Sequence, residues 1–243
     1  MRKIVIILSV LLTVPIVALF GQNENEQDIS EEIIVSELNN HYSIMLKQIS
    51  ESEYTTQKNE AEHLRHKPYK VITDFKEAQK MLGRKMKIFE RQEGEYKFIE
   101  TEITFKDGTK RRFDWTFKDG FRAYFPKLNV LLLEAEATGD WQIDLNESRE
   151  EATKGNPYNH AVSPDKQLRI NGYYIGGAAE GCEYWLEKWN TKKKKYDFFA
   201  PFEGFIFYFS RDWFWTNNST VLFRYGCWEE CQYYEMEIIE KRI

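Results

Sequence analysis

The three cysteines carry the most reactive side chains of the sequence, and two of them are closely spaced. Cys227 and Cys231 are separated by Trp228–Glu230, whereas Cys182 stands alone. If the three intervening residues form a hairpin loop, the flanking positions oppose each other with Cα atoms about 4.5–5.5 Å apart, which is within disulfide range. We therefore predict a Cys227–Cys231 disulfide and a free, buried thiol at Cys182. No second paired motif accompanies the cysteines, so they do not predict a zinc site.

The histidines predict no metal centre. His63 and His66 lie at i and i+3 in a polar segment, whereas the helical zinc motif places its two histidines at i and i+4. We interpret this segment as the solvated end of a helix. His41 and His160 are isolated in the sequence, and we interpret them as surface or packing residues. The sequence therefore predicts neither a metal nor a cofactor.

Carboxylates occur at two places where hydrolytic chemistry can be considered. Glu134 and Glu136 alternate along an expected strand, and paired carboxylates hydrolyse glycosidic bonds when they lie about 5 or about 9 Å apart. Asp140 and Asp144 follow with Asn146 close behind, a spacing that matches no standard calcium loop. A hydrolase that uses acidic residues near Glu134 or Asp140 is therefore the alternative function.

Aromatic side chains are dense between Phe202 and Trp215, and they suggest a binding surface. Within this segment Trp213 and Trp215 share one face of an expected strand, and Tyr208 lies on the face opposite a row of phenylalanines. Flat rings offer a large contact area to sugars or extended peptides at low entropic cost. The alternative is that one face of the row fills the core. The candidate binding residues are Trp213, Trp215, Tyr208 and Trp228, the last at an expected loop tip.

The first 21 residues have the layout of a secretory signal. Arg2 and Lys3 precede a mainly apolar run from Ile4 to Phe20, and Gly21 stands before a polar stretch. We predict a signal peptide over residues 1–21 and a disordered linker over 22–29. Export to the periplasm, the outer surface or the medium follows, with no membrane span after cleavage. The alternative is an uncleaved membrane anchor at residues 4–20, because about 17 apolar residues lie at the lower limit of a span.

Charge and aromatic content narrow the class of partner. The net charge is −5, which disfavours nucleic acid and anionic membrane surfaces as partners. Aromatic residues make up 16% of the chain, and six of the seven tryptophans lie beyond residue 140. The C-terminal half therefore contains the material for a large core. The basic run Lys192–Lys195 lies between two apolar stretches and is interpreted as a solvated turn.

The segment before residue 84 follows a helical period. Apolar residues from Ile34 to Ile49 fall on one helical stripe, which predicts a helix over about 30–60. A second helix is predicted from Asp74 to Leu82, with Thr73 as its N-cap and Gly83 as its end. Residues 30–83 are thus expected to form a helical lead-in.

After Gly83 the period changes from 3.6 to two, which predicts strands. Tyr96–Phe105 and Lys110–Phe117 alternate apolar and charged residues around an Asp107-Gly108 turn. Leu128–Leu133 is apolar at nearly every position, which predicts a strand buried on both faces. We predict an antiparallel β domain over residues 84–243.

An internal repeat covers the last 120 residues. A turn at Ser163–Asp165 precedes one expected strand, and Cys182–Trp185 opens the next. The same order recurs with Thr216–Asn218 and then Cys231–Tyr234, and a weaker copy begins at about residue 124. Repeats of about 40 to 50 residues are typical of propeller blades and of stacked four-stranded units.

Ser163–Leu168 reads Ser-Pro-Asp-Lys-Gln-Leu and resembles the turn-strand opening of WD40-like periplasmic propeller repeats. Lys166 stands where that motif has glycine, and residues 124–243 hold about three units, fewer than a closed propeller needs. The resemblance implies a stacked-hairpin architecture used for binding and assigns no catalytic residue.

The sequence as a whole predicts an α+β protein with N-terminal helices followed by repeated antiparallel hairpins, either partly propeller-like or a stacked meander. The predicted function is a non-catalytic envelope or secreted module that binds a protein, a peptide or a glycan.

Overall fold

The computed structural model describes residues 33–113, 120–135, 139–148, 155–175, 181–226 and 231–241. The predicted signal peptide (1–21) and linker (22–29) lie outside these ranges. Among the described residues, no helix has the length and apolar character needed to cross a bilayer.

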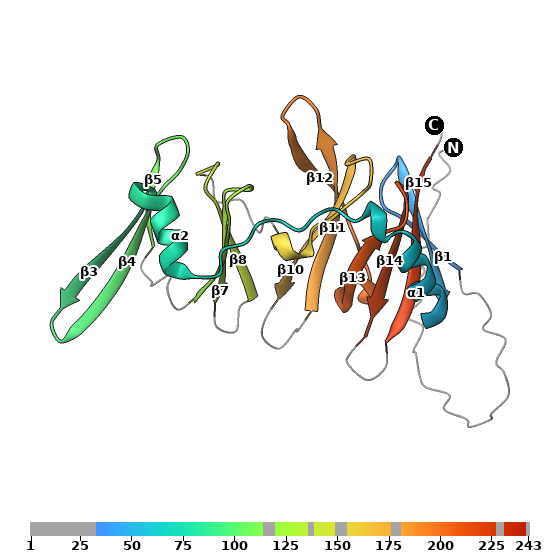
Figure 1. Cartoon of the computed structure of the whole chain (residues 1–243), viewed down its shortest axis with the longest axis horizontal. Helices are drawn as coiled ribbons and strands as arrows, with labels where there is room; N and C mark the ends of the chain where they lie inside the picture. Colours follow the sequence, from blue (N-terminus) through green and yellow to red (C-terminus); the bar gives the residue numbers. More distant parts are fainter. Residues whose placement is uncertain are drawn as a thin grey trace, which may run out of the picture. The chain divides into compact units, whose positions relative to one another are not determined.

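Four antiparallel sheets, built mostly from strands that follow one another along the chain, make up the fold (Figure 1). Their strand orders are β3-β4-β5, β6-β7-β8, β12-β11-β10-β9 and β1-β2-β15-β14-β13. The strands are β1 (Ile33–Glu37), β2 (Tyr42–Ile49), β3 (Met86–Glu93), β4 (Tyr96–Thr104), β5 (Lys110–Phe113), β6 (Phe121–Phe125), β7 (Val130–Ala135), β8 (Gly139–Asp144), β9 (Ala161–Val162), β10 (Leu168–Ile175), β11 (Gly181–Asn190), β12 (Lys195–Pro201), β13 (Ser210–Trp215), β14 (Thr220–Tyr225) and β15 (Gln232–Glu240). The helices are α1 (Glu51–Glu60), α2 (Phe75–Leu82) and α4 (Phe205–Tyr208), with short 3-10 turns at Glu62–Leu64, Gly83–Lys85 and Pro157–Asn159.

The predicted α+β class with N-terminal helices is wrong, because two strands, β1 and β2, occupy the start of the supposed helical lead-in. The apolar residues of this segment satisfy a helical stripe, but they satisfy a period of two as well. In β2, Tyr42, Ile44 and Leu46 are buried and alternate with half-buried residues. All eight residues of β2 pair with β15 at the far end of the chain. Tertiary pairing therefore overrides the local pattern.

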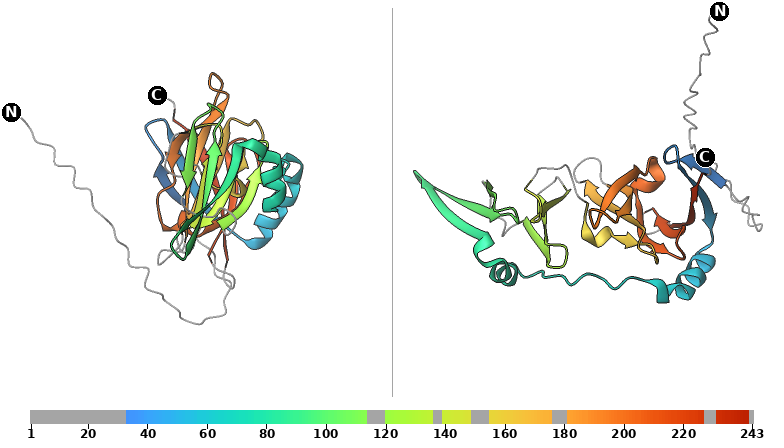
Figure 2. Two further views of the ribbon diagram at one scale, coloured as in Figure 1. Left: turned by 90° about the vertical axis from the view of Figure 1, so that its left-hand side faces the viewer. Right: turned by 90° about the horizontal axis from the view of Figure 1, so that it is seen from above.

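Two short helices follow β2. α1 begins at a capping box, in which Ser50 and Glu53 satisfy each other's backbone N–H groups. α2 matches the prediction for residues 74–82, except that its N-cap is Asp74, whose carboxylate accepts a hydrogen bond from the Glu77 backbone N–H. It ends at Gly83, where φ is +54°. An extended segment, residues 65–74, connects the turn after α1 to α2 (Figure 2), and we call it the connecting segment.

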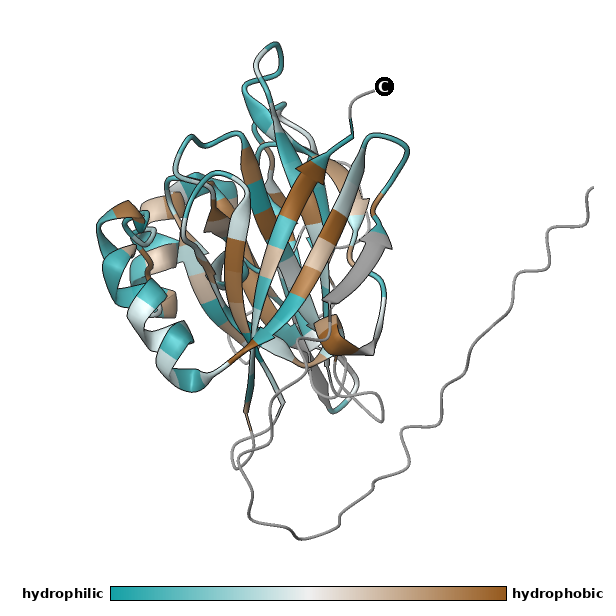
Figure 3. Cartoon of the chain, turned by 90° about the vertical axis from the view of Figure 1, so that its right-hand side faces the viewer, coloured by the Kyte–Doolittle hydropathy of each residue, from teal (hydrophilic) through white to brown (hydrophobic). Residues whose placement is uncertain are grey.

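The sheets bury their apolar faces in pairs. The β3–β5 and β6–β8 sheets share one core with α2, and the β9–β12 sheet shares another with the five-stranded sheet. α1 covers the opposite face of the five-stranded sheet through Tyr54. Figure 3 shows hydrophobic and hydrophilic positions alternating along the strands that face the viewer. Leu131 and Leu133 face one core and Leu132 another, which confirms a strand buried on both faces.

The hairpins of the predicted repeat are present. Its three copies correspond to β7–β8, β10–β11 and β14–β15, each an antiparallel pair. The turns of the last two copies touch, because the Asp165 backbone N–H donates to Oδ1 of Asn218 at 3.0 Å. Lys166 has φ +62°, the backbone conformation that a glycine at this position of the motif would favour. The likeness to propeller repeats itself stays a prediction.

One part of the aromatic segment differs from its predicted strand. Phe205–Tyr208 forms the short helix α4, and the strand β13 begins only at Ser210. The ring of Phe207 is buried and stacks on Phe202 with centroids 5.1 Å apart. Clustering of the rings in the core therefore shapes this segment more than their alternation along the chain does.

Candidate functional site

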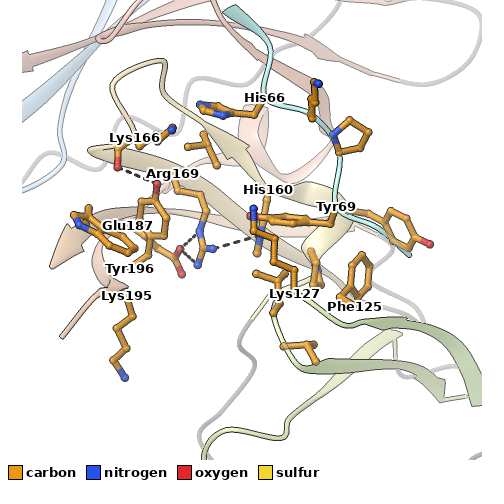
Figure 4. A pocket seen from close by; sticks show the side chains of 18 of the residues that line it. His66, Tyr69, Phe125, Lys127, His160, Lys166, Arg169, Glu187, Lys195 and Tyr196 are labelled. Atoms are coloured by element: carbon orange, nitrogen blue, oxygen red, sulfur yellow. Dashed lines mark hydrogen bonds and ion pairs between the residues drawn. The ribbon is translucent and has the colours of Figure 1, made fainter. Parts of the chain in front are cut away.

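A cleft of about 1720 Å³ lies among the described residues. Its walls come from the connecting segment, from the β6–β8 sheet with the turn between β6 and β7, and from the β9–β12 sheet with the turns at its ends (Figure 4). The connecting segment is attached to the β9–β10 turn at one point and to β6 at another. His66 Nε2 lies 3.0 Å from the carbonyl oxygen of Ser163, and Ile72 forms an antiparallel bridge with Tyr124.

A buried ion pair lies on one wall of the cleft. Arg169 on β10 and Glu187 on β11 are direct cross-strand partners, and Nε and Nη2 of the guanidinium both contact Oε2 of the carboxylate. The other carboxylate oxygen accepts hydrogen bonds from Trp185 Nε1 and Asn171 Nδ2, each at 3.0 Å. Because Glu187 is only 7% exposed, these partners are what make its burial tolerable.

Arg169 is held on its remaining sides by rings. Its guanidinium carbon lies 4.3 Å from the centroid of Tyr196, within cation–π range. On another side Nη1 lies 3.4 Å from Nδ1 of His160. Figure 4 shows the guanidinium between Glu187 and His160. The Tyr196 hydroxyl donates to the backbone carbonyl of Lys166 at 2.9 Å, so the ion pair is tied to the turn before β10.

His160 is half-buried, and its Nε2 atom is shielded from solvent. Its ring lies edge-on to Tyr69 with centroids 5.6 Å apart, and Nδ1 is 3.4 Å from the Tyr69 hydroxyl. Burial lowers the pKa of His160 well below its usual value, and the positive charge of Arg169 lowers it further. The imidazole is therefore neutral at physiological pH. It packs in the wall of the cleft and brings no charge to it.

Two aromatic rings in the cleft face solvent. Tyr158 is 57% exposed and Phe198 is 65% exposed, and both line the cleft. Tyr158 is steadied by Phe125, whose ring centroid lies 5.1 Å away. Phe198 sits on β12, an edge strand of its sheet. Large exposed rings beside a cavity are typical of ligand contact surfaces.

The aromatic residues selected from the sequence lie apart from these rings. Trp215 is buried in the core, and Trp213 packs against the same core. Both line a second, smaller cavity of about 300 Å³. Tyr208 is half-buried with its ring against Gly181. Trp228 lies outside the described residues.

The structure tests only some of the predictions made for the cysteines. Cys227 is outside the described residues, so the Cys227–Cys231 disulfide stays a prediction. Sγ of Cys231 lies 3.7 Å from Nη2 of Arg211. Cys182 has a free thiol and is half-buried on β11, and burial raises its pKa.

Glu134 and Asp140, the acidic residues of the alternative hydrolase function, lie outside the large cleft. Glu134 and Asp140 are cross-strand partners on β7 and β8. Glu134 pairs with Arg122, and Oδ2 of Asp140 accepts from Asn156 Nδ2 at 2.7 Å and from the backbone N–H of Tyr174 at 3.1 Å. Both carboxylates are thus occupied by protein donors. Glu136 lies outside the described residues, and no group of three or more metal-ligating side chains occurs among those described.

Sequence reasoning missed most residues of the cleft. The sequence predicts His160 to be a surface or packing residue, and it assigns no role to Arg169 or Glu187. The available signal is their cross-strand register, since Arg169 near the start of β10 and Glu187 near the end of β11 face each other at the open end of the hairpin. Lys192–Lys195 begins in the exposed turn predicted for it, yet Lys194 and Lys195 also line the cleft. The chain matches no family model, and no curated protein or solved structure is significantly similar to it.

Proposed function

We propose that this protein is a non-catalytic binding module and that the cleft holds an extended ligand, such as a glycan or a peptide. The observation that carries the proposal is the exposure of Tyr158 and Phe198 inside the cleft. An exposed ring loses water when a flat apolar surface covers it, and it gives up little rotational freedom. The volume of about 1720 Å³ exceeds the range of about 300–1,000 Å³ that is usual for small-molecule pockets, which supports a ligand of several units.

The state of the ionisable groups supports binding over hydrolysis. General acid–base catalysis needs a group that can exchange a proton with a substrate within hydrogen-bond reach. Glu187 is saturated by Arg169, Trp185 and Asn171, and the enclosed His160 is neutral. Glu187 is thus held by its partners, and His160 packs as a neutral ring in the wall of the cleft.

The test is a binding screen of the mature protein on an array of glycans and on an array of synthetic peptides. The double variant Tyr158→Ala/Phe198→Ala should lose every ligand that the wild type binds through the cleft. The control variant Tyr174→Ala/Met81→Ala removes two exposed side chains that do not line the cleft, and it should bind as the wild type does. A ligand set that is identical for all three proteins contradicts the proposal.

Export belongs to the same proposal. The basic and apolar layout of residues 1–21 supports it, and β1 begins only at Ile33. N-terminal sequencing of the protein recovered outside the cytoplasm is expected to start at Gln22. A sequence that still begins with Met1 would support the anchored alternative through residues 4–20.

A further inference from the structure

The carboxylates that line the cleft are already engaged by the protein itself. Each has a donor or a cation within hydrogen-bond or ion-pair distance. The contacts are Glu62 with Arg65, Asp144 with Asn146, Glu147 with Lys195, Asp165 with Ser163 and Gln167, Glu187 with Arg169, and Asp197 with Lys193 and Asn190.

The lysines of the cleft are in a different state. Lys67, Lys127, Lys166 and Lys194 line it, and none of their ammonium groups has a partner within the described part of the chain. They come from four separate places: the connecting segment, the β6–β7 turn, the β9–β10 turn and the β11–β12 turn. The chain as a whole has a net charge of −5, yet seven lysines and arginines and six carboxylates line this cleft, so its formal charge is positive.

Two of these lysines occupy backbone conformations that lysine rarely adopts. Lys166 has φ +62° and Lys194 has φ +54°. Left-handed backbone is disfavoured for residues with a Cβ atom, and glycine or asparagine usually fills such positions. The other described non-glycine residues with positive φ are Asn129 and Asp212, which are types that tolerate it. Unfavourable backbone of this kind concentrates at functional sites. We therefore expect that lysine occupies these two positions because its ammonium group is needed in the cleft.

We infer that the ligand of the cleft is an anionic saccharide, an oligomer of sugar rings that carry carboxylate or sulfate groups. This inference rests on the proposed binding function. The apolar faces of the sugar rings cover Tyr158 and Phe198, and the anionic groups meet Lys127 and Lys166. The hydroxyl groups donate to carboxylate oxygens that remain open, such as Oδ2 of Asp165, because both of its donors in the described part of the chain bond Oδ1. An acidic peptide brings few hydroxyl donors to those carboxylates.

The observations favour a saccharide over single-stranded nucleic acid for a similar reason. Both ligands combine flat rings with negative charge, and both suit aromatic side chains next to lysines. A phosphodiester chain, however, places a charge on every unit, and surfaces that bind it are strongly basic. Here carboxylates line the same walls as the lysines.

The test measures the affinity of the mature protein for hexagalacturonate, for its fully methyl-esterified form and for a heparin hexasaccharide. Oligothymidylate and poly-glutamate are measured beside them as a nucleic acid and an acidic peptide. The neutral ester has the same backbone without the charge. At least one anionic saccharide is expected to bind at least tenfold more tightly than the ester, with an affinity that falls as NaCl is added. The variant Lys127→Gln/Lys166→Gln should lose at least tenfold in affinity. The control Lys76→Gln/Lys80→Gln, which removes two lysines from α2 outside the cleft, should lose less than twofold.

Three results overturn the inference. The first two do so without contradicting the proposed binding function of the cleft. Equal binding of the ester and of both anionic saccharides, lost in Tyr158→Ala/Phe198→Ala, retains the cleft as a binding site and removes the charge preference. Binding of only oligothymidylate or poly-glutamate, lost in Lys127→Gln/Lys166→Gln, retains the charge preference and removes the saccharide. Binding of no saccharide, or binding that neither double variant weakens, excludes the saccharide from this cleft.

Discussion

Arg169 and Glu187 oppose each other directly across β10 and β11, and their ion pair is closed off from solvent, with side chains 13% and 9% exposed. A buried pair of this kind adds little net stability over a well-packed apolar pair, because both charges lost their water. Removal of one partner is strongly destabilising, because the other charge then stays buried without a counter-charge. The pair therefore holds the wall of the cleft in one arrangement.

The first prediction concerns this asymmetry. Arg169→Met should lower the free energy of unfolding by about 3–5 kcal/mol, because Glu187 stays buried without its cation. The double variant Arg169→Met/Glu187→Gln should recover part of the loss, since the amide retains an oxygen for Trp185 and Asn171 and carries no charge. Urea denaturation followed by tryptophan fluorescence measures both.

The exposed pair Arg122 and Glu134 provides the matched control. Its side chains are 59% and 45% exposed, so Glu134→Gln should change stability by less than about 1 kcal/mol. If Arg169→Met cost no more than Glu134→Gln, the buried pair would not hold the wall together as described.

The second prediction concerns pH. In the folded protein the pKa of His160 is well below 6.5, because the ring is buried beside Arg169. The unfolded chain therefore binds a proton near pH 6.5 that the folded chain does not bind. Stability falls as the pH drops below about 6.5, by up to about 2 kcal/mol between pH 7 and pH 5. His160→Gln should remove this part of the pH dependence, as measured by urea denaturation at both pH values.

His41→Gln, at an exposed turn, controls for the loss of one imidazole from the chain. Carboxylates such as Asp107 and Asp197, whose pKa values are lowered by hydrogen bonds, lose their stabilising contribution at lower pH. The comparison is therefore kept above pH 5. A wild type and a His160→Gln variant with the same slope between pH 7 and pH 5 would rule out the enclosed neutral ring.

The third prediction separates stability from binding at Lys166. Left-handed backbone costs a residue with a Cβ about 1–2 kcal/mol, and a glycine avoids this cost. Glycine also has greater freedom in the unfolded chain, which lowers the free energy of unfolding by about 0.5–1 kcal/mol. Lys166→Gly should therefore raise the free energy of unfolding by roughly 0.5–1 kcal/mol and weaken the binding of an anionic saccharide. Lys166→Ala loses the same charge but keeps the Cβ, so it should weaken binding without the gain. Thermal denaturation and titration of the two variants give the comparison, and a Lys166→Gly variant less stable than Lys166→Ala contradicts it.

The sequence predicted the β architecture better than it predicted the start of the chain. The Asp107-Gly108 turn, the doubly buried β7 and the end of α2 at Gly83 all depend on local chemistry, and the structure confirms them. The strands β1 and β2 were missed because their identity depends on β15, which no local pattern reveals.

The cleft was missed for a related reason. Its residues come from the connecting segment, from two sheets and from several turns, so no short motif contains them. Aromatic density pointed instead to the segment around Trp213 and Trp215, where the rings pack against the core. Density along the chain does not tell which rings remain exposed after the sheets have packed.

The fourth prediction tests how tightly α4 packs on β11. A Cβ added at Gly181 would overlap the ring of Tyr208, and overpacking of this kind costs about 1–3 kcal/mol. Gly181→Ala should therefore be destabilising, and Tyr208→Ala in the same chain should relieve the overlap. A double-mutant cycle by urea denaturation measures the coupling. Additive effects of the two substitutions would show that the ring lies elsewhere.

The fifth prediction concerns the pairing of the C-terminal strand β15 with the N-terminal strand β2. β15 lies between β14 and β2, and β2 contributes the buried side chains of Tyr42, Ile44, Leu46 and Ile49. At about 1.5–3 kcal/mol for each buried side chain, their loss amounts to roughly 6–12 kcal/mol. That is comparable to the whole stability of a typical domain.

A chain that begins at Ser50 should therefore fail to fold, whereas a chain that begins at Tyr42 retains β2 and should fold with reduced stability. Near-ultraviolet circular dichroism and size-exclusion chromatography distinguish the two, because the shorter chain exposes the edge of β15 and should aggregate. Addition of a peptide spanning residues 33–49 to the shorter chain during refolding should restore part of the native signal, since β2 joins β15 by main-chain pairing. Cooperative unfolding of the Ser50 chain on its own would mean that β15 does not depend on the N-terminal hairpin.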